Sequence, residues 1–449
     1  MKKLTAVVLC AGKGLRMSSK KSKILHKLGG LEIINHIVNT LRSIDAEEIV
    51  LVASKDNKME LENISAGKNI EMAIQTDLSG TCSATRVGLE VLKNKDSTVL
   101  LTCGDVPFIK KETLGKMLDY ITNTDNSLVV LGFNTKNMNN RYGKLVLNKK
   151  NELEKIIEYK DADSLQRNST LCNAGIYMAK NSKLLEQFLG LVKNNNAAGE
   201  YYLTDIVELM AKNGLKCGYI VADENEVVGI NSRKELSLAE RIFQDFRREE
   251  FMNRGVTLID PATTFFSYDT EIDNDVTIEP NVMLMTGVRI HSGVTIKSFS
   301  YLEGCEIESD VTVGPFARLR PGSILGKNSK VGNFCEIKNS RIGSNSKVSH
   351  LSYVGDSDVG ENTNVGAGTV TCNYDGYSKF RTKIGENSFI GSNTILIAPV
   401  EVGENSLTAA GSVITKNVPA NSIAAARAEQ KNIPEGMLSY RKKREKQHH

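Results

Sequence analysis

The sequence predicts a two-part α/β protein, in which a mostly parallel sheet flanked by helices is followed by a parallel β-helix. Three observations carry this prediction. Up to about residue 230, short apolar runs alternate with amphipathic segments. After Pro261 an aliphatic residue recurs every six positions, and a segment of helical periodicity separates the two parts. A period of six fits neither a helix nor a simple strand, but it is typical of the flat faces of a β-helix coil.

Length and composition limit the possible classes of protein. The 449 residues are enough for about three domains of ordinary size. With 40% apolar and 24% charged residues, the chain is expected to fold into a sizeable core. A net charge of +4 and the absence of Trp argue against a nucleic-acid-binding surface. The eight cysteines are scattered with no C-x-x-C pair, so we expect reduced thiols, a cytoplasmic location and no zinc site.

The first part is predicted to contain four buried strands with helices between them. The strands are expected at 5–10, 48–53, 97–103 and 127–133, and two of the helices at 31–44 and 83–92. Strands that alternate with helices predict a Rossmann-like, mostly parallel sheet, whose ligands lie beyond the carboxyl ends of the strands. The apolar run at the start is short, so we expect a buried strand there and neither a secretory leader nor membrane insertion.

The segment from 232 to 254 is predicted to form one long linking helix, which gives three expected regions: 1–233, 234–254 and 255–449. In the last region, the residues expected to point into the coils are Ile272, Ile278, Leu284, Ile290, Ile296, Leu302, Ile342, Val348, Val354, Ile384, Ile390, Leu396, Val402, Thr408 and Ile414. Two segments, 318–322 and 372–380, break the repeat, and both are expected to leave the wall of the coil. The basic segment 441–446 is expected to be a disordered tail, with contact to coenzyme phosphates as the alternative; His448 and His449 look like a tail or a tag remnant.

Loops after two of the predicted strands carry groups suited to phosphate and to Mg²⁺. Gly12-Lys13-Gly14 follows the first strand, where backbone N–H groups and a cation can surround an anion. Asp105 follows the strand that ends at Cys103, and a carboxylate at that edge of the sheet is a hard oxygen ligand for Mg²⁺. Taken alone, the glycines also fit an ordinary strand–helix turn, and the aspartate also fits a helix cap.

As a set, the motifs resemble those of a known family. Leu9-Cys10-Ala11-Gly12-Lys13-Gly14, Lys23, Gly80-Thr81, Gly104-Asp105-Val106-Pro107 and the run from Gly199 to Asp205 look like the sugar-nucleotide pyrophosphorylases. Together with His350-Leu351-Ser352-Tyr353 and Asn373-Tyr374-Asp375-Gly376, they resemble the bifunctional N-acetylglucosamine-1-phosphate uridyltransferases/glucosamine-1-phosphate N-acetyltransferases. The resemblance covers nearly the whole chain. It implies a nucleotide-binding first domain, a left-handed β-helix, a homotrimer, and the synthesis of UDP-N-acetylglucosamine for cell-envelope polymers such as peptidoglycan.

At the first site the resemblance implies uridylyl transfer, in which N-acetylglucosamine 1-phosphate attacks the α-phosphorus of UTP and pyrophosphate leaves. It implies that Asp105 and Asn231 hold Mg²⁺. The residues that it places around the nucleotide are Leu9, Cys10, Ala11, Gly12, Arg16, Lys23, Gln75, Gly80 and Thr81, and those around the sugar are Gly143, Glu158 and Asn173. The positions that depart from the residues usual in the family are Cys10, Leu15, Ser22, Cys103 and Ala174, none of which removes a charge or a metal ligand.

At the second site the resemblance implies acetyl transfer from acetyl-CoA to glucosamine 1-phosphate, with His350 as the general base on the amine. The cations and donors implied for the sugar phosphate are Arg320, Lys338, Tyr353, Asn364 and Lys379. A backbone N–H near Ala367 is implied as the donor to the oxyanion, and the coenzyme slot is implied to include Asn373, Tyr374, Ser392, Ala410 and Arg427. Composition alone leaves open that His350 is an exposed structural histidine.

Two other functions remain open on the sequence. One is a nucleotidyltransferase whose β-helix serves only assembly or regulation, and the other is a non-catalytic binding protein that keeps both folds. The polar residues around His350 argue against the first, because a scaffold needs none of them. The combination of Asp105 with Lys23 and Asn231 argues against the second.

Overall fold

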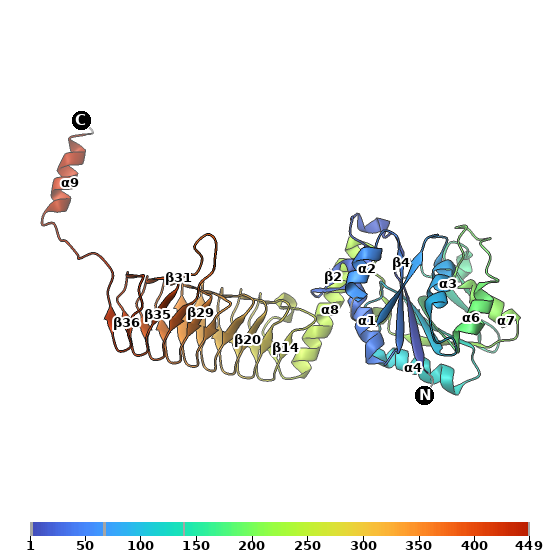
Figure 1. Cartoon of the computed structure of the whole chain (residues 1–449). Helices are drawn as coiled ribbons and strands as arrows, with labels where there is room; N and C mark the ends of the chain where they lie inside the picture. The colour runs from blue at the N-terminus through green and yellow to red at the C-terminus, as the bar shows by residue number, and fades with distance from the viewer. Residues whose placement is uncertain (1–2, 66–68, 138–139, 448–449) are drawn as a thin grey trace. The chain divides into compact units, whose positions relative to one another are not determined.

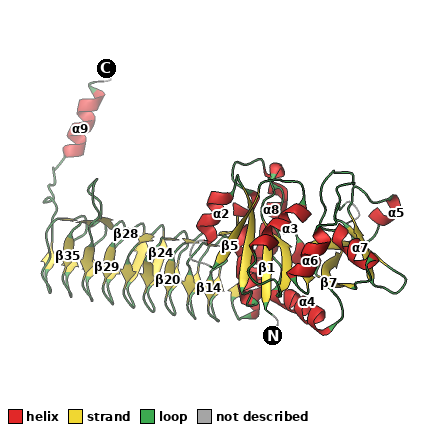
Figure 2. Ribbon diagram, turned by 45° about the vertical axis from the view of Figure 1, so that its right-hand side comes forward, coloured by secondary structure: helices red, strands yellow, loops and turns green. Residues whose placement is uncertain are grey.

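The structure is a computed structural model that describes residues 3–65, 69–137 and 140–447, so His448 and His449 lie outside the described residues. The chain divides into two compact units, Met1–Asp245 and Phe246–His449. Each unit has its own hydrophobic core, and the strands and helices of both are drawn in Figure 1 and Figure 2.

The first unit is built on one sheet with the strand order β11-β7-β10-β6-β1-β4-β5. These strands are β1 (Leu4–Leu9), β4 (Glu48–Ser54), β5 (Ile70–Gln75), β6 (Thr98–Cys103), β7 (Leu128–Asn134), β10 (Leu171–Ala179) and β11 (Cys217–Ala222). Strand β10 runs antiparallel to β6 and β7, whereas the pairs β1–β4, β1–β6, β4–β5 and β7–β11 are parallel. The mostly parallel sheet is confirmed, and the four predicted strands match β1, β4, β6 and β7 to within one residue at each end.

Helices cover both faces of this sheet. α1 (Ile33–Ser43), α2 (Lys58–Ser65) and α4 (Lys111–Asn123) share a core with one face, and α3 (Thr81–Val91), α6 (Ser182–Leu189) and α7 (Asp205–Lys212) share a core with the other. Ala6 and Val8 belong to the first core and Val7 to the second, because successive side chains of a strand point to opposite faces. The smaller elements are β2 (Lys27–Leu28), β3 (Leu31–Glu32), β8 (Lys144–Leu147), β9 (Leu153–Ile157) and α5 (Ser164–Arg167). The two predicted helices are confirmed as α1 and α3.

Helix α8 (Arg233–Asn253) confirms the long helix predicted over 232–254. Ala239 and Phe243 pack in a core cluster of the first unit, and Phe251 belongs to the core of the second unit. Within the described residues, no helix combines the length and the apolar composition that crossing a bilayer requires.

From β12 to β38, over residues 257–424, the chain forms a parallel β-helix of three sheets, as the hexapeptide repeat predicts. The first sheet contains β12 (Thr257–Leu258), β15 (Thr277–Ile278), β18 (Thr295–Ile296), β21 (Thr312–Val313), β24 (Lys330–Asn333), β27 (Lys347–His350), β30 (Asn364–Val365), β33 (Phe389–Ile390), β36 (Leu407–Thr408) and β38 (Ile423–Ala424). The second contains β13 (Phe265–Phe266), β16 (Met283–Leu284), β19 (Tyr301–Leu302), β22 (Arg318–Leu319), β25 (Glu336–Lys338), β28 (Tyr353–Gly355), β31 (Val370–Cys372), β34 (Ile395–Ile397) and β37 (Val413–Ile414). The third contains β14 (Glu271–Ile272), β17 (Arg289–Ile290), β20 (Cys305–Ile307), β23 (Ser323–Leu325), β26 (Arg341–Ile342), β29 (Ser357–Val359), β32 (Thr382–Ile384) and β35 (Val400–Val402).

The interior of the β-helix is made by the repeat itself. Every residue predicted to point inward is buried, and equivalent residues stack in register, as Ile278 does on Ile296. A single coil cannot bury its inner face alone, so each coil depends on its neighbours for stability. Asn and Asp occupy many corners in the left-handed conformation, as at Asn345 (φ 60°) and Asn362 (φ 53°), because their short polar side chains tolerate it.

One of the two predicted interruptions is wrong and the other is confirmed. Arg318–Leu319 forms β22, and the fully buried Leu319 pairs with Leu302 and Ile337. The coil from Leu302 to Leu319 has 17 residues instead of 18 (319 − 302), and this shorter step disturbs the count of six without breaking the wall. Between β31 and β32 the chain does leave the wall, and an antiparallel bridge from Tyr374 to Lys379 closes the loop (Figure 1).

The prediction of a disordered tail over 441–446 is also wrong. Gly436–Glu445 forms helix α9, all of whose residues are exposed or half-buried. Its Leu, Met, Lys and Arg side chains have high helix propensity, so the segment can be helical without packing on a core.

Candidate active sites

A cavity of about 480 Å³ lies at the carboxyl end of the sheet in the first unit. Its lining comes from the loops after β1 and β6, the end of β5 and the start of α3: Leu9, Ala11, Gly12, Lys13, Lys23, Gln75, Leu78, Gly80, Thr81, Ala84, Cys103, Asp105 and Glu200. Eight of these residues are among those predicted for the nucleotide or the metal. Cys10 is buried and Arg16 is exposed, and neither belongs to the lining.

Lys23 joins the two residues predicted to hold Mg²⁺. Its ammonium forms an ion pair with the Asp105 carboxylate and donates to Asn231 Oδ1 at 2.8 Å. The Ile230 N–H donates to the Asp105 carbonyl at 3.0 Å, which ties the segment before α8 to the loop after β6. A carboxylate oxygen and an amide oxygen therefore converge at one point. These are hard oxygen donors of the kind that Mg²⁺ takes together with substrate phosphates, so the residues present fit the ion.

Two residues that the sequence analysis did not assign to the site hold these loops in place. The buried Asn57 donates to the Cys10 carbonyl at 2.9 Å and to Ser22 Oγ at 3.3 Å, so it ties the loop after β1 to the segment before Lys23. The second is Tyr201, whose carbonyl oxygen would lie 2.4 Å from a Cβ at Gly80. Gly80 itself has a φ of 134°, so this close approach requires glycine.

The thiols near this cavity are not nucleophiles. Burial raises the pKa of Cys103 to about 12, and the neighbouring Asp105 carboxylate acts in the same direction. Burial also raises the pKa of Cys10, with Cys103 and Asp105 adding to the effect. Because only the thiolate attacks, both thiols are unreactive at neutral pH.

The three residues predicted for the sugar lie together in the first unit. The Asn173 N–H donates to the Gly143 carbonyl at 2.8 Å, and a Cβ on Gly143 would lie 3.4 Å from Glu158 Oε2. Burial raises the pKa of Glu158, although the hydrogen bond from Thr204 (3.3 Å) opposes the shift. Burial followed by two neighbouring carboxylates raises the pKa of Asp205 to about 6. The Asn173 amide and the Glu158 carboxyl group thus offer both donors and acceptors to hydroxyl groups beside Gly143.

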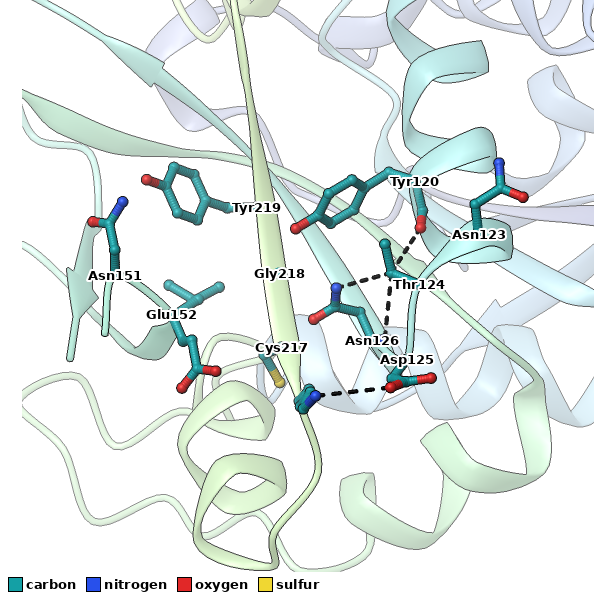
Figure 3. Close-up of a pocket in the computed structure, with 12 residues that line it drawn as sticks. Tyr120, Asn123, Thr124, Asp125, Asn126, Asn151, Glu152, Cys217, Gly218 and Tyr219 are labelled. Carbon is teal, nitrogen blue, oxygen red and sulfur yellow. Dashed lines mark hydrogen bonds and ion pairs between the residues drawn. The ribbon is translucent and has the colours of Figure 1, made fainter. Parts of the chain in front are cut away.

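A second cavity, of about 430 Å³, lies at the amino ends of β7 and β11, which is the opposite edge of the sheet (Figure 3). It is lined by Tyr120, Asn123, Thr124, Asp125, Asn126, Asn151, Glu152, Leu153, Lys216, Cys217, Gly218 and Tyr219. Among the described residues that line this cavity, Lys216 is the one cation. Its ammonium lies 3.8 Å from the Asp125 carboxylate. A single paired lysine does not suit phosphate, so the chemistry of the first unit belongs to the cavity at the carboxyl end.

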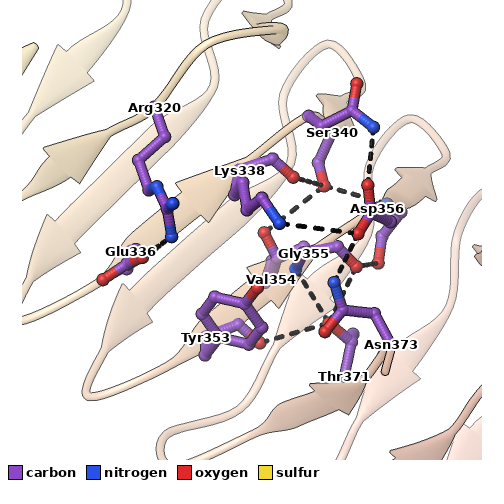
Figure 4. Close-up of polar contacts among 12 residues, drawn as sticks. Arg320, Glu336, Lys338, Ser340, Tyr353, Val354, Gly355, Asp356, Thr371 and Asn373 are labelled. Carbon is purple, nitrogen blue, oxygen red and sulfur yellow. Dashed lines mark hydrogen bonds and ion pairs between the residues drawn. The ribbon is translucent and has the colours of Figure 1, made fainter. Parts of the chain in front are cut away.

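In the second unit, three cations lie close together: Arg320 and Lys338, at the ends of β22 and β25 (Figure 4), and Lys379, whose ammonium is next to that of Lys338. Arg320 is held by Glu336, with 2.8 Å between Nη1 and Oε1. The adjacent ammonium of Lys379, followed by burial, lowers the pKa of Lys338, and Arg320 acts in the same direction. Like charges held this close are suited to a dianion such as a sugar phosphate.

Two further residues predicted for the sugar phosphate lie on different sheets. Tyr353 belongs to the same sheet as the cations, and its hydroxyl lies over Gly355, where a Cβ would be 2.3 Å from it. Asn364 belongs to β30, on the sheet that also carries His350, and it pairs there with Lys347.

His350 ends β27 and is exposed. Its Nδ1 lies 2.8 Å from Asn333 Oδ1. An amide oxygen can only accept, so Nδ1 carries the proton and Nε2 of the neutral ring holds the lone pair. Asn333 was not predicted from the sequence, and it orients the ring from the preceding coil, where the two residues are register partners.

Several residues predicted for acetyl transfer form one row along an edge of the β-helix. Val348, Val365, Ile390 and Thr408 stack in register on successive coils. Two positions after each of them come, in the same order, His350, Ala367, Ser392 and Ala410. Arg427 donates from Nη1 to the Ala410 carbonyl at 2.9 Å, at the end of this row.

Comparisons with known proteins agree with this division into two sites. Residues 6–171 match the MobA-like NTP transferase domain, and residues 269–304, 304–339 and 381–416 match the bacterial transferase hexapeptide. The fold and the two matches define a transferase that joins a nucleotidyltransferase-type domain to a hexapeptide transferase domain.

Relatives of nearly equal length share both parts. The bifunctional protein GlmU of Sinorhizobium fredii is 46% identical over 430 residues, which cover 96% of this chain and 93% of that protein. The bifunctional proteins GlmU of Zymomonas mobilis (41% identity, 99% of both chains) and Paracoccus denitrificans (45% identity, 96% of this chain and 95% of that protein) are similar over the same extent. The chain belongs to the family of bifunctional GlmU proteins, and the family resemblance is confirmed.

Proposed function

We propose that this chain makes UDP-N-acetylglucosamine in two steps at two separate sites. The β-helix acetylates glucosamine 1-phosphate from acetyl-CoA, and the first unit transfers UMP from UTP to N-acetylglucosamine 1-phosphate with release of pyrophosphate. The observation that carries the proposal is that each unit holds its own set of groups. The cavity with Lys23 between Asp105 and Asn231 suits phosphate and metal, whereas the β-helix carries a row that starts at His350 and a group of three cations, which suit transfer to a phosphorylated amine.

At the first site the chain positions reactants and offsets charge. Backbone N–H groups of the loop after β1, together with Lys13 and Lys23, face the triphosphate from the cavity wall. Asp105 and Asn231 would hold Mg²⁺, which neutralises charge on the phosphates when bound. The sugar phosphate is held by Gly143, Glu158 and Asn173, and in-line transfer then depends on orientation rather than on a covalent intermediate.

At the second site His350 Nε2 accepts a proton from the ammonium of glucosamine 1-phosphate, and the free amine attacks the thioester carbonyl of acetyl-CoA. A backbone N–H near Ala367 donates to the oxyanion that forms. When the intermediate collapses, the C–S bond breaks and the coenzyme leaves as a thiol, taking up the proton that the histidine received, while the nitrogen loses its second proton to solvent and becomes the neutral amide. Arg320, Lys338 and Lys379 hold the phosphate, and the row toward Ala410 and Arg427 holds the coenzyme.

We also propose that the chain works as a homotrimer with the acetyl-transfer site shared between copies. A column of exposed apolar side chains, Phe299, Phe316, Phe334 and Leu351, runs along the corner next to Asn333 and His350; their exposed fractions are 54%, 46%, 56% and 64%. The phenylalanine rings stack with centroids 4.9 and 5.2 Å apart. A continuous apolar stripe is unfavourable in water, and a second copy that covers it would lie beside the histidine.

The cysteines support a reducing compartment for this chemistry. All eight are free, and six of them are buried. Free thiols persist in the cytoplasm, where the substrates of both reactions are also expected, so we propose a cytoplasmic location.

Two single variants test the division of activities. His350→Ala is expected to abolish acetylation of glucosamine 1-phosphate and leave UTP-dependent uridylyl transfer nearly intact, whereas Asp105→Ala is expected to do the reverse. The parent protein, given acetyl-CoA, glucosamine 1-phosphate and UTP together, is expected to produce UDP-N-acetylglucosamine. Loss of both activities in either folded variant would contradict the two-site proposal.

A further inference from the structure

Asp356 contacts two residues of the second site, Lys338 and Asn373. It occupies the corner between β28 and β29 with φ 47° and is only 5% exposed. Its N–H donates to the Lys338 carbonyl at 2.9 Å, and its own carbonyl accepts from the Thr382 N–H at 3.2 Å. Thr382 is the residue at which the chain re-enters the wall after the loop over 373–381. The backbone of Asp356 is therefore bonded to the coil before it and to the far end of the loop.

The carboxylate of Asp356 binds both the near end of that loop and the phosphate side of the site (Figure 4). Oδ1 accepts from Asn339 Nδ2 at 2.5 Å, and Oδ2 accepts from Nδ2 of Asn373, the first residue of the loop. Oδ2 also lies 3.9 Å from the Lys338 ammonium. The carboxylate thus joins three successive coils, and together with the backbone carbonyl of Asp356 it holds the two ends of the loop.

The charge of this carboxylate matters for the cations around it. Lys338 and Lys379 stand close enough to repel each other, and a buried negative charge beside them offsets that repulsion. Burial alone would raise the pKa of the Asp356 carboxyl, but the two amide hydrogen bonds and the two nearby ammonium groups hold it below its usual range. The group is therefore ionised throughout the neutral pH range.

We propose that Asp356 is a positioning residue for acetyl transfer, which fixes the Lys338 ammonium and the Asn373 amide relative to each other and so couples the phosphate side of the site to the coenzyme side. The inference rests on the proposed acetyltransferase function. Asp356 itself contacts neither substrate; it acts through the two residues that it holds.

The test compares Asp356→Asn with Asp358→Asn in the full-length protein. An asparagine at 356 keeps the shape and tolerates a positive φ, but it offers one oxygen and one NH₂ group to two amide donors, so at least one hydrogen bond is lost. Asp358 lies two residues further along the chain, in β29, half-exposed and paired at 2.8 Å with Arg381, the last residue of the loop, and its substitution makes the same change of charge without altering the contacts to Lys338 and Asn373.

We expect Asp356→Asn to lower kcat/KM for acetyl transfer by about 10- to 100-fold, the range for loss of a charge-assisted hydrogen bond. The KM values for acetyl-CoA and for glucosamine 1-phosphate should both rise, because the carboxylate holds a residue on each side. Asp358→Asn should stay within about twofold of the parent, and uridylyl transfer should be unchanged in both variants. A purely structural role would instead lower the melting temperature and the active fraction and leave both KM values unchanged.

Three results would overturn the inference. One is an Asp356→Asn variant with parental kinetics, another is a loss confined to the active fraction, and the third is an equal loss in Asp358→Asn. An inactive parent protein would refute the proposed function and the inference together, whereas an active parent with an unaffected Asp356→Asn variant would refute the inference alone.

Discussion

The hydrogen bond from His350 to Asn333 predicts how strongly acetyl transfer depends on a residue that contacts no substrate. In Asn333→Ala the Nδ1 proton loses its acceptor, whose distance is 2.8 Å in the structure. A hydrogen bond between neutral groups contributes about 1 kcal/mol, and one to a charged imidazolium about 2 kcal/mol. The difference of about 1 kcal/mol acts only as the ring becomes charged, and it corresponds to about fivefold in kcat. Loss of the favoured tautomer lowers kcat further, so we expect a fall of about 10- to 30-fold.

The assay is steady-state acetylation of glucosamine 1-phosphate, with uridylyl transfer by the same protein as the internal control. KM for both substrates should change by less than about twofold, because Asn333 acts on the base and not on binding. Asn333→Asp keeps an oxygen acceptor and should retain kcat within a few-fold. The reasoning is refuted if Asn333→Ala keeps the parental kcat, or if Asn333→Asp loses as much as Asn333→Ala.

Three further predictions concern assembly, pH dependence and the packing of the coils. Phe316→Asn replaces an exposed ring by a residue that tolerates the φ of 55° at this position, so the coil should stay folded. Sedimentation velocity should then show that the trimer dissociates at micromolar concentration. A trimer as stable as that of the parent would contradict the proposed apolar interface. The raised folded pKa of Asp205, about 6 against 3.8, means that ionisation opposes folding above pH 6 and that this cost is lost as the pH falls toward 4. Asp205→Asn should therefore raise the melting temperature at pH 8 and change it little at pH 4, and the opposite order would show that the sign is wrong. Gly360→Ala would place a Cβ 2.5 Å from the Glu386 amide nitrogen on the next coil, so it should destabilise the β-helix by about 3 kcal/mol in thermal unfolding. Gly115, in α4, has open space around it, so Gly115→Ala should instead stabilise the first unit by up to about 1 kcal/mol.

Much of the fold can be predicted from the sequence because periodicity follows directly from geometry. Strands β1, β4, β6 and β7 are buried on both faces, so they read as continuous apolar runs. The inward positions of the β-helix recur because each flat face has the same length. Arg318–Leu319 was wrongly predicted to leave the wall for the same reason. The coil before it is one residue short, so its residues still stack on the next coil although the six-residue spacing is lost.

The candidate sites could be predicted only where a local pattern marks them. Asp105 directly follows a buried strand, and the loop after β1 carries its own glycines. No local pattern identifies Asn57, because its hydrogen-bond partners, Cys10 and Ser22, lie 47 and 35 residues away along the chain. Asn333 was not predicted because the coil that joins it to His350 has 17 residues. A regular coil of three six-residue repeats has 18 residues and would place Gly332, not Asn333, next to His350.

The number of stacked coils between His350 and Ala410 sets the distance between these two residues. Neighbouring parallel strands lie ~4.8 Å apart, so the three steps between these residues span ~14 Å. Removing or duplicating one complete turn between them would change this span by a single layer and leave the stacking above and below intact. The separation of His350 and Ala410 can therefore change only in whole layers of ~4.8 Å.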